Sequence, residues 1–402
     1  MVTKSILTVG DSVDGYRMVG IPDGLGAYDN GDGTFTLLMN HELRRAQGVT
    51  RDHGATGAFV SKWTIDKDTL QVEKGEDLIQ HLHLTSGPTA LERLCSADLA
   101  AFSAFYNTDS GKGYDGRIFM NGEETSGGRA FGHVATGSDA GESYQLTAIG
   151  AGEWENLVAN PATGDKTVVL GSQDAGNGEI AVYTGEKQTT GSAVDKAGLT
   201  NGSRGAIKVD GFPLENDGIP SGTRFSVVPS GGTGFKRPED IAWDPTDPNI
   251  AYFVTTNAFG APSRLWRLTF DDASNPAAGG TIDELLDGTE GQQMLDNITV
   301  SHRGQLILQE DPGNQPYVAR VWRYNPATDQ LVEIAHHDTD LFAPASPGFI
   351  TQDEESSGVI DVSSILGDGK FLFDDQVHTT ANDPELVERG QLLALHVPPG
   401  QK

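Results

Sequence analysis

Short apolar runs separated by polar turns dominate the chain. Runs of this length, bounded by Gly, Asp, Asn and Pro, predict strands. The clearest strands are expected at Gly33–Asn40, Arg117–Asn121, Lys166–Leu170, Glu179–Thr184, Ile250–Thr255, Arg264–Phe270, Gln305–Gln309, Val318–Tyr324, Lys370–Asp375 and Gly390–Val397. Helical periodicity is confined to two short stretches, Leu91–Tyr106 and Thr281–Gln293. The pattern predicts an all-β fold with short helical insertions.

The predicted strands group into about six units, several of which share one plan. An acidic residue opens the unit, a short apolar strand and a Gly-containing turn follow, and a second strand ends in acidic residues. Arg237–Thr256 and Leu295–Asp311 match each other loosely in this way, and so do Gly122–Gly127 and Asp353–Gly358. The repetition favours a single six-bladed β-propeller over residues 1–402. The alternative is two β-sandwich domains, but no low-complexity linker divides the chain.

Composition agrees with this fold and narrows the possible partners. The 402 residues exceed the size of a usual single core, and the 51 glycines suit many tight turns. The net charge of −29 repels nucleic-acid phosphates and anionic lipid, so neither a nucleic acid nor a membrane is expected as a partner. No apolar run approaches the roughly 20 residues of a membrane span. The single cysteine, Cys95, excludes an intrachain disulfide.

The propeller fold makes a prediction about chemistry. The inner strands of all blades end at one mouth of the central channel, so acidic residues at these ends meet although they are far apart in sequence. Clustered carboxylates repel one another unless cations lie between them. We therefore expect a metal cluster at one mouth of the channel.

Five candidate ligands each have a second interpretation. Glu42 follows a predicted strand in the sequence NHE, where it is either a ligand or a solvated strand end. Cys95 is either a small buried apolar residue or a thiolate ligand to a transition metal. Glu123 and Glu124 follow a strand directly and form either a ligand pair or a polar edge. Glu179 opens a strand and suits either a ligand or a surface turn.

The sequence RPE at residues 237–239 is the most informative cluster. Residues two apart in an extended segment face the same side, which places Arg237 beside Glu239. The pair is either an ordinary salt bridge or a guanidinium aimed at an oxyanion that a carboxylate-bound metal holds. Asp311 ends the matching strand of the next unit.

Several common site motifs are missing from the sequence. It contains no HExxH zinc motif, no GxSxG nucleophile turn and no phosphate-binding P-loop. The acidic run Asp29–Asp32 is interpreted as a hairpin turn, because Gly31 and Gly33 occupy positions where a calcium-binding EF-hand loop needs oxygen ligands.

The ordered set of NHE, a single Cys, a strand-end EE pair, RPE and an acid after an LxL strand resembles bacterial alkaline phosphatases of the PhoX type. The resemblance runs from about Pro22 to Val377. It implies a six-bladed propeller that holds a mixed iron(III) and calcium cluster and hydrolyses phosphate monoesters outside the cytoplasm. The protein would then be extracellular or periplasmic and a monomer, with a small phosphate ester as its partner.

The resemblance also implies roles for individual residues. Arg237 matches the phosphate-binding arginine, and Cys95 matches the iron-binding cysteine. The remaining matched ligands are Glu124, Glu179, Glu239 and Asp311.

The functional hypothesis is a metal-dependent alkaline phosphatase. Clustered cations would polarise a phosphate monoester and convert a bridging oxygen into the nucleophile, while Arg237 clamps the phosphoryl oxygens. The alternatives are a metal-dependent lactonase or esterase on the same fold, and a non-enzymatic binding propeller with structural calcium. The sequence leaves the physiological substrate, the preference for monoesters over diesters and the metal stoichiometry open.

Overall fold

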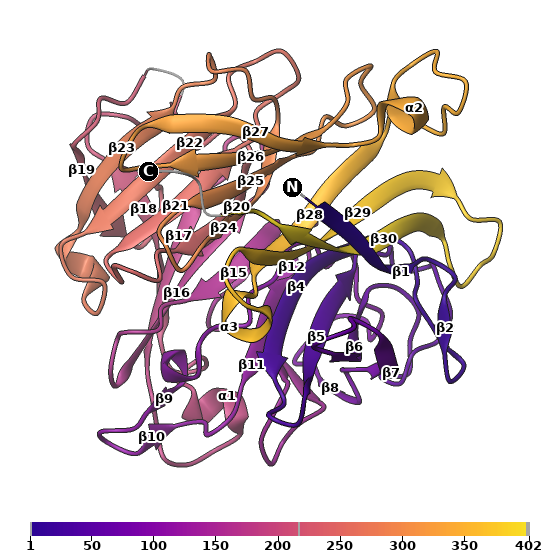
Figure 1. The fold of residues 1–402 in the computed structure, drawn as a ribbon. Coiled ribbons are helices and arrows are strands. Elements are labelled where there is room, and N and C mark those ends of the chain that lie inside the picture. The colour runs from indigo at the N-terminus through magenta and orange to yellow at the C-terminus, as the bar shows by residue number, and fades with distance from the viewer. Residues whose placement is uncertain (1, 216–217, 399–402) are drawn as a thin grey trace.

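The protein is built almost entirely from antiparallel strands, in agreement with the predicted all-β class (Figure 1). The computed structural model describes residues 2–215 and 218–398. Its sheets lie side by side around a central region, with β4, β15, β20, β24 and β28 near the middle of Figure 1. Direct contacts join β11 to β15, β15 to β20, β20 to β24, β24 to β28, and β28 to β4.

Four of the sheets contain four or five strands each. The first sheet has the order β4 (Pro22–Asp29), β5 (Thr34–His41), β6 (Phe59–Asp66), β7 (Val72–Asp77). The second has the order β11 (Ile118–Gly122), β12 (Gly128–Val134), β13 (Glu142–Gln145), β8 (His81–His83), with β14 (Ala151–Gly152) paired to β12. A later sheet has the order β24 (Leu295–Val300), β25 (Leu306–Glu310), β26 (Arg320–Asn325), β27 (Gln330–His336). The last has the order β1 (Val2–Thr8), β30 (Glu388–His396), β29 (Lys370–Thr380), β28 (Glu354–Asp361).

The remaining large sheet has nine strands and joins two repeats. Its order is β15 (Trp154–Ala159), β16 (Lys166–Gln173), β17 (Ile180–Glu186), β18 (Ser203–Val209), β19 (Thr223–Val228), β23 (Gly280–Leu286), β22 (Arg264–Phe270), β21 (Ile250–Thr255), β20 (Pro238–Trp243). Strands β15 and β20 lie at its two edges and also contact each other, so the sheet nearly closes on itself. Because this sheet is continuous, the predicted count of six blades stays a prediction.

Short elements complete the described chain. Two small hairpins pair β2 with β3 and β9 with β10. Their bounds are β2 (Ser12–Val13), β3 (Tyr16–Arg17), β9 (Tyr106–Asn107) and β10 (Lys112–Gly113). The helices are single turns: α1 (Ala193–Lys196), α2 (Thr339–Phe342), α3 (Ser363–Leu366) and the 3-10 turns Phe102–Ala104 and Pro276–Ala278.

The helices predicted at Leu91–Tyr106 and Thr281–Gln293 are not formed, so both predictions are wrong. Residues 281–286 belong to β23, which pairs with β19 and β22. Residues 94–98 are extended, and Leu94 and Asp98 form antiparallel bridges with Glu123 and Met120. Only Phe102–Ala104 turns as a helix. Pairing with a neighbouring strand therefore overrides a weak local helical pattern.

The apolar core is divided among the spaces between neighbouring sheets. One cluster lies between the sheets of β11 and β15 and includes Met120, Trp154 and Tyr183. Similar clusters separate β16–β18 from β21–β22, β21–β22 from β24–β26, and β25–β26 from β28–β30. Each fully buried large apolar side chain contributes about 1.5–3 kcal/mol. The length of the chain is thus accommodated by several modest cores.

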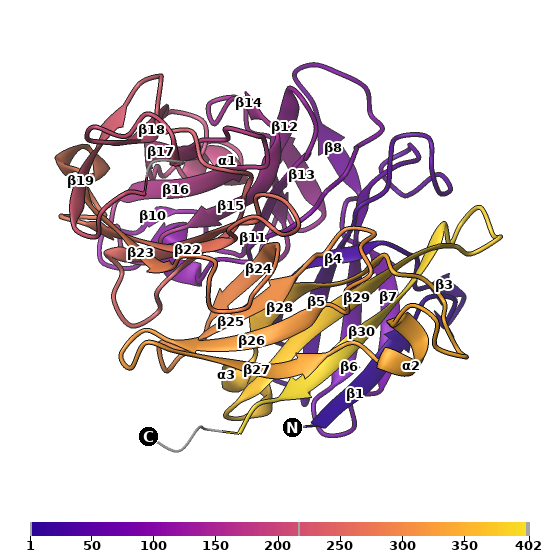
Figure 2. The same ribbon diagram turned by 90° about the horizontal axis from the view of Figure 1, so that it is seen from above.

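The ends of the chain are joined through one sheet. Strand β1 lies beside β30 (Figure 2) and pairs with it antiparallel. In this pairing Val2 lies opposite His396. The tight turn between β4 and β5 is the predicted hairpin. Gly31 and Gly33 have φ of 78° and 100° there, and Asp29 and Asp32 accept hydrogen bonds from backbone N–H groups of the turn.

Candidate metal centre

Six inner segments repeat one local structure at the same end of the molecule. In each, the N–H group at the end of a second strand donates to the carbonyl oxygen of a residue that precedes the inner strand, at 2.8–3.0 Å. The six pairs are Glu42–Ile21, Glu124–Arg93, Asp174–Glu153, Thr256–Arg237, Asp311–Met294 and His378–Asp353. The repeat places two rings of side chains. The inner ring consists of the residues two positions after each accepting carbonyl residue, and the outer ring consists of the residues whose N–H groups donate.

The inner ring is almost wholly acidic. Its members are Asp23, Cys95, Glu155, Glu239, Asp296 and Glu355. The extended segment 94–98 supplies Cys95, since Leu94 pairs with Glu123 and the N–H of Gly24 donates to the Cys95 carbonyl at 3.2 Å. The pairing register shifts at the acid in β4, β15, β20 and β24, and from two residues after Glu355 in β28, as a β-bulge does. Bulges of this kind redirect a side chain, here toward the centre.

The ring residues converge into groups that suit metal ions. In each of three groups, the ligand atoms all lie within 4.8 Å of one another. The groups are Asp23 with Glu42 and Cys95, Cys95 with Glu124 and Glu155, and Glu155 with Glu239 and Asp296. Cys95 and Glu155 are each shared by two groups, so the three groups form one continuous cluster.

Burial of this many acids without cations is electrostatically unfavourable. Burial, followed by the charge of Glu42, raises the pKa of Asp23 to about 7. Burial, followed by the charge of Asp23, raises the pKa of Glu155 to about 8. The pKa values of the Glu239 and Asp296 carboxyls also lie well above their usual range, mainly because of burial.

The donor set fits metal ions. Asp296 Oδ1 is buried and has no hydrogen-bond partner among the described residues. The Cys95 thiol donates to Asp23 Oδ2 at 3.3 Å, and its pKa is raised chiefly by burial. Thiolate with carboxylates is a ligand set for transition metals, whereas a carboxylate-only group suits Ca²⁺. Bound cations would replace the protons that the raised pKa values imply.

Two arginines lie beside the cluster. Arg237 binds both carboxylate oxygens of Asp174, at 2.8 and 2.7 Å, and its Nη2 lies 3.1 Å from Glu239 Oε1. Arg93 donates from Nε to Glu42 at 2.6 Å and from Nη2 to Glu124. The side chains of Arg237 and Arg93 are about one-third exposed, at 36% and 33%. The side chain of Arg237 therefore lies next to Glu239, as the RPE sequence predicts.

A cavity of about 210 Å³ opens next to the rings. Its lining includes both acids and bases: Ile21, Glu42, Arg44, Gln47, Arg93, Asp311, Glu355, His378 and Glu388. His378 bonds Glu388 at 2.7 Å and faces Glu355 at 3.7 Å, and these carboxylates raise its pKa to about 11 despite its burial. The cavity is thus lined by both cationic and anionic side chains, and it adjoins the cluster through Glu42.

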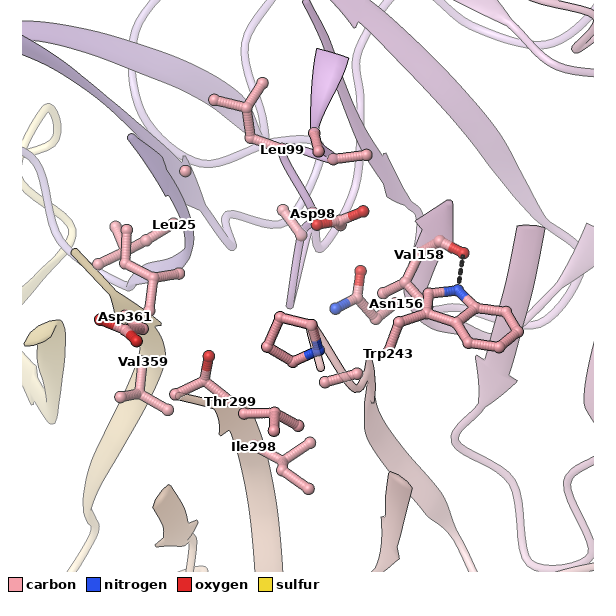
Figure 3. A pocket seen from close by; sticks show the side chains of 18 of the residues that line it. Leu25, Asp98, Leu99, Asn156, Val158, Trp243, Ile298, Thr299, Val359 and Asp361 are labelled. Carbon is pink, nitrogen blue, oxygen red and sulfur yellow. Dashed lines mark hydrogen bonds between the residues drawn. The ribbon is translucent and has the colours of Figure 1, made fainter. Parts of the chain in front are cut away.

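A second cavity, of about 310 Å³, lies at the far end of the inner strands (Figure 3). It is lined by residues further along the same strands, among them Leu25, Asn156, Ile298 and Val359. Asp98, Asp240, Asp244 and Asp361 also line it, and Asp240 accepts hydrogen bonds from Asn156 and from the backbone N–H groups of Ile241 and Ile298. The ligand-atom groups all lie at the opposite end.

Four of the seven predicted metal ligands lie in the cluster. Glu42, Cys95, Glu124 and Glu239 each belong to at least one ligand-atom group. Asp311 lies in the outer ring and lines the 210 Å³ cavity, outside the three groups.

The structure does not bring the other two predicted ligands into the cluster. Glu123 is buried against Arg129, whose Nε and Nη2 donate to its two oxygens at 2.7 and 2.6 Å. Glu179 accepts a hydrogen bond from the N–H of Gly232 at 2.7 Å and lies in none of the groups. The carboxylate of Glu123 is therefore occupied by its ion pair with Arg129. Glu179 follows the outer-ring residue Asp174 by five positions and lies outside the cluster.

Sequence reasoning missed four of the six inner-ring residues. It did not single out Asp23, Glu155, Asp296 or Glu355, nor Arg93 and His378 beside them. A signal does exist: an acid or Cys is followed by Gly or a short polar residue in PDG, LCS, WEN, PED, LDN and EES. The loose match between Arg237–Thr256 and Leu295–Asp311 contains two of these triplets, PED and LDN. The other four triplets are too short to recognise as repeats by themselves.

Within residues 2–215 and 218–398, no helix has the length and apolar character required to cross a bilayer.

Comparison with known proteins gives a structural match only. No protein-family model matches the chain, and no curated protein matches it in sequence. The structure of Pseudomonas fluorescens PhoX in complex with vanadate, a transition-state analogue, aligns with a TM-score of 0.66 at 11% identity, over 98% of this chain and 94% of that one. The periplasmic gluconolactonase PpgL of Pseudomonas aeruginosa aligns with a TM-score of 0.41 at 12% identity, over 94% and 85% of the two chains. The chain therefore shares the fold of PhoX, which confirms the structural part of the resemblance.

Proposed function

We propose that the protein is a metal-dependent phosphatase that hydrolyses phosphate monoesters outside the cytoplasm. The observation that carries the proposal is the continuous cluster of buried carboxylates and one thiol, with the Arg237 guanidinium 3.1 Å from one of its acids. The shared fold with PhoX, whose structure holds the transition-state analogue vanadate, supports it.

The cluster offers two kinds of metal site. The two groups that contain Cys95 would hold iron(III), because a thiolate with carboxylates suits a transition metal. The group of Glu155, Glu239 and Asp296 has only oxygen donors and would hold calcium. Cations bound there supply electrostatic activation of a phosphate ester and of water.

The protein residues would bind and orient the substrate. Asp174 fixes Arg237 through Nε and Nη2, which leaves Nη1 to donate charge-assisted hydrogen bonds to phosphoryl oxygens. A positioned cation of this kind stabilises the charge that develops in the transition state. His378 is held as a cation between Glu355 and Glu388 and would supply a proton near the cavity.

The test is turnover of p-nitrophenyl phosphate at alkaline pH by the purified protein, together with elemental analysis. We expect activity that a chelator abolishes and that added cations restore, in a protein containing iron and calcium. Activity that resists the chelator, or no activity in the metal-replete protein, contradicts the proposal.

Two other outcomes identify the alternatives. Hydrolysis of a lactone that inorganic phosphate does not inhibit indicates a lactonase, because a lactone has no dianion for Arg237 to bind. Calcium without iron, no visible absorbance and no hydrolysis indicate a binding propeller with a structural metal.

A further inference from the structure

Arg93 occupies the same place in its repeat as Arg237 occupies in another. Each lies two residues before an inner-ring ligand, Cys95 or Glu239, and each accepts the repeated backbone hydrogen bond through its carbonyl oxygen. Both have positive φ, 44° for Arg93 and 54° for Arg237. The fold therefore presents the two side chains from equivalent positions on two inner segments. In chain order, the inner segment that carries Glu155 lies between these two.

The backbone itself does not require arginine at these positions. The corresponding residues in the other repeats are Ile21, Glu153, Met294 and Asp353, none of which is a cation. Ile21 and Met294 adopt the same strained φ, at 51° and 42°. A left-handed conformation costs energy in any residue with a side chain, so such positions concentrate at functional sites. The choice of arginine at residue 93 thus needs a reason beyond the turn.

The ion pairs of Arg93 leave part of its guanidinium available. Its Nε and Nη2 donate to Glu42 and Glu124, while Nη1 has no hydrogen-bond partner among the described residues. Nη1 of Arg237 is in the same state, since Asp174 and Glu239 engage only Nε and Nη2. Arg93 also lines the 210 Å³ cavity beside the cluster. Each arginine is therefore held by two acids through Nε and Nη2, while its Nη1 has no partner among the described residues.

We propose that Arg93 is a second phosphate-binding residue, which grips the phosphoryl group of the substrate together with Arg237. The inference rests on the proposed phosphatase function. Two guanidiniums presented from separate repeats would bind different oxygens of one phosphoryl group through their Nη1 atoms, and each charge-assisted contact adds affinity and fixes orientation. Glu42 and Glu124 would then act as anchors for Arg93 as well as metal ligands.

The experiment measures binding of inorganic phosphate to the metal-replete protein by calorimetry, with metal content determined on the same samples. Arg93→Gln should weaken phosphate binding by roughly 10- to 100-fold, the loss of one charge-assisted hydrogen-bonded contact. Arg93→Lys keeps the charge but cannot bind Glu42, Glu124 and phosphate with separate nitrogen atoms, so its phosphate affinity should fall between those of wild type and Arg93→Gln. Metal content should stay near the wild-type value in both variants.

Arg267→Gln is the matched control. Arg267 is 32% exposed and is paired with Asp283 in the outer part of a sheet, away from the cavity. Its replacement should leave phosphate binding unchanged.

Three results separate the possible roles of Arg93. If Arg93→Gln and Arg93→Lys lose metal, and their metal-loaded fraction binds phosphate as wild type does, Arg93 is only a counter-ion and the inference is overturned. If the wild-type protein binds no phosphate, the inference is overturned as well. If wild type binds phosphate through Arg93 but hydrolyses no p-nitrophenyl phosphate, the proposed function fails and the inference stands.

Discussion

Neighbouring residues of the same type receive opposite roles from their surroundings. Glu123 and Glu124 are adjacent, and in extended chain their side chains point to opposite sides. Glu123 meets Arg129 in a buried bidentate ion pair, whereas Glu124 faces Cys95 and Glu155. Residue type alone does not separate a structural acid from a candidate ligand, because the decision depends on which partner each side chain meets.

Replacement of Arg237 tests whether this residue binds the substrate without also being needed to bind metal. Arg237→Ala should lower phosphatase kcat by about 100-fold or more, because a positioned cation at the developing charge is lost. Metal content should stay near wild type, since no ligand atom is removed. Steady-state kinetics with elemental analysis check both expectations.

The control for this substitution is Arg224→Ala, which removes an exposed ion pair with Asp271 on a distant strand and should leave kcat unchanged. Glu239→Ala should release metal. If Arg237→Ala releases metal as readily as Glu239→Ala does, Arg237 supports the structure of the site and does not bind phosphate.

At the scale of elements, the extended segment 94–98 is what brings the thiol into the ring. It fits between β4 and β11 because Gly24 has no side chain at the point of closest approach. A Cβ atom on Gly24 would lie 2.4 Å from the backbone nitrogen of Ala97 and 2.6 Å from the carbonyl carbon of Ser96. Backbone atoms cannot yield as a flexible side chain can, so the segment depends on this glycine.

Gly24→Ala should therefore displace the segment that carries Cys95. We expect a loss of about 1–3 kcal/mol in the free energy of unfolding, as for other overpacked interiors, and reduced iron content. Urea unfolding and elemental analysis measure the two effects. Gly176→Ala is the matched control, since a Cβ atom there meets nothing within 4 Å and φ is not positive. Equal stability and iron content in the two variants would show that the close approach is not required.

At the scale of the whole molecule, the net charge of −29 has two components. Most acids lie on the surface, while the ring acids are buried together and carry raised pKa values. A buried acid with a raised pKa binds protons in the folded state that it releases on unfolding, so its ionisation opposes folding. Cations in the cluster would remove this cost.

The metal-free protein should consequently lose stability as pH rises from 6.5 to 8.5. In this interval Asp23 and Glu155 ionise in the folded state, with pKa values of about 7 and 8, whereas they are already ionised when unfolded. His378, with a pKa of about 11, acts in the same direction. The buried His41 and His133 have pKa values of about 3 and affect stability mainly below pH 6.5. A tenfold change in an ionisation constant corresponds to about 1.4 kcal/mol, so the expected loss is on the order of a few kcal/mol.

Urea unfolding at both pH values, with chelator and with added calcium and iron, measures this dependence. Glu155→Gln should reduce the slope in chelator, because one ionising group is removed. Cations should weaken or reverse the slope, since metal binding favours the deprotonated ligands. Stability of the chelated protein that rises over this interval would contradict the charge balance described for the cluster.

The sequence by itself determined the strand class, the repeated plan of the units, and the placing of acids at strand ends, because these follow from local patterning. RPE at residues 237–239 and the carboxylates Glu42 and Glu124 were identified in the same way. Only the tertiary structure decided that Leu94–Asp98 is extended, that Cys95 joins Asp23 and Glu155, and that Glu123 and Glu179 stay outside. These outcomes depend on strand register and on contacts between residues far apart in sequence, such as Ser357 with Asp23 at 334 positions and Gln376 with Asp23 at 353 positions. Local propensity does not contain that information, since a shift of one residue in register turns every side chain to the other face.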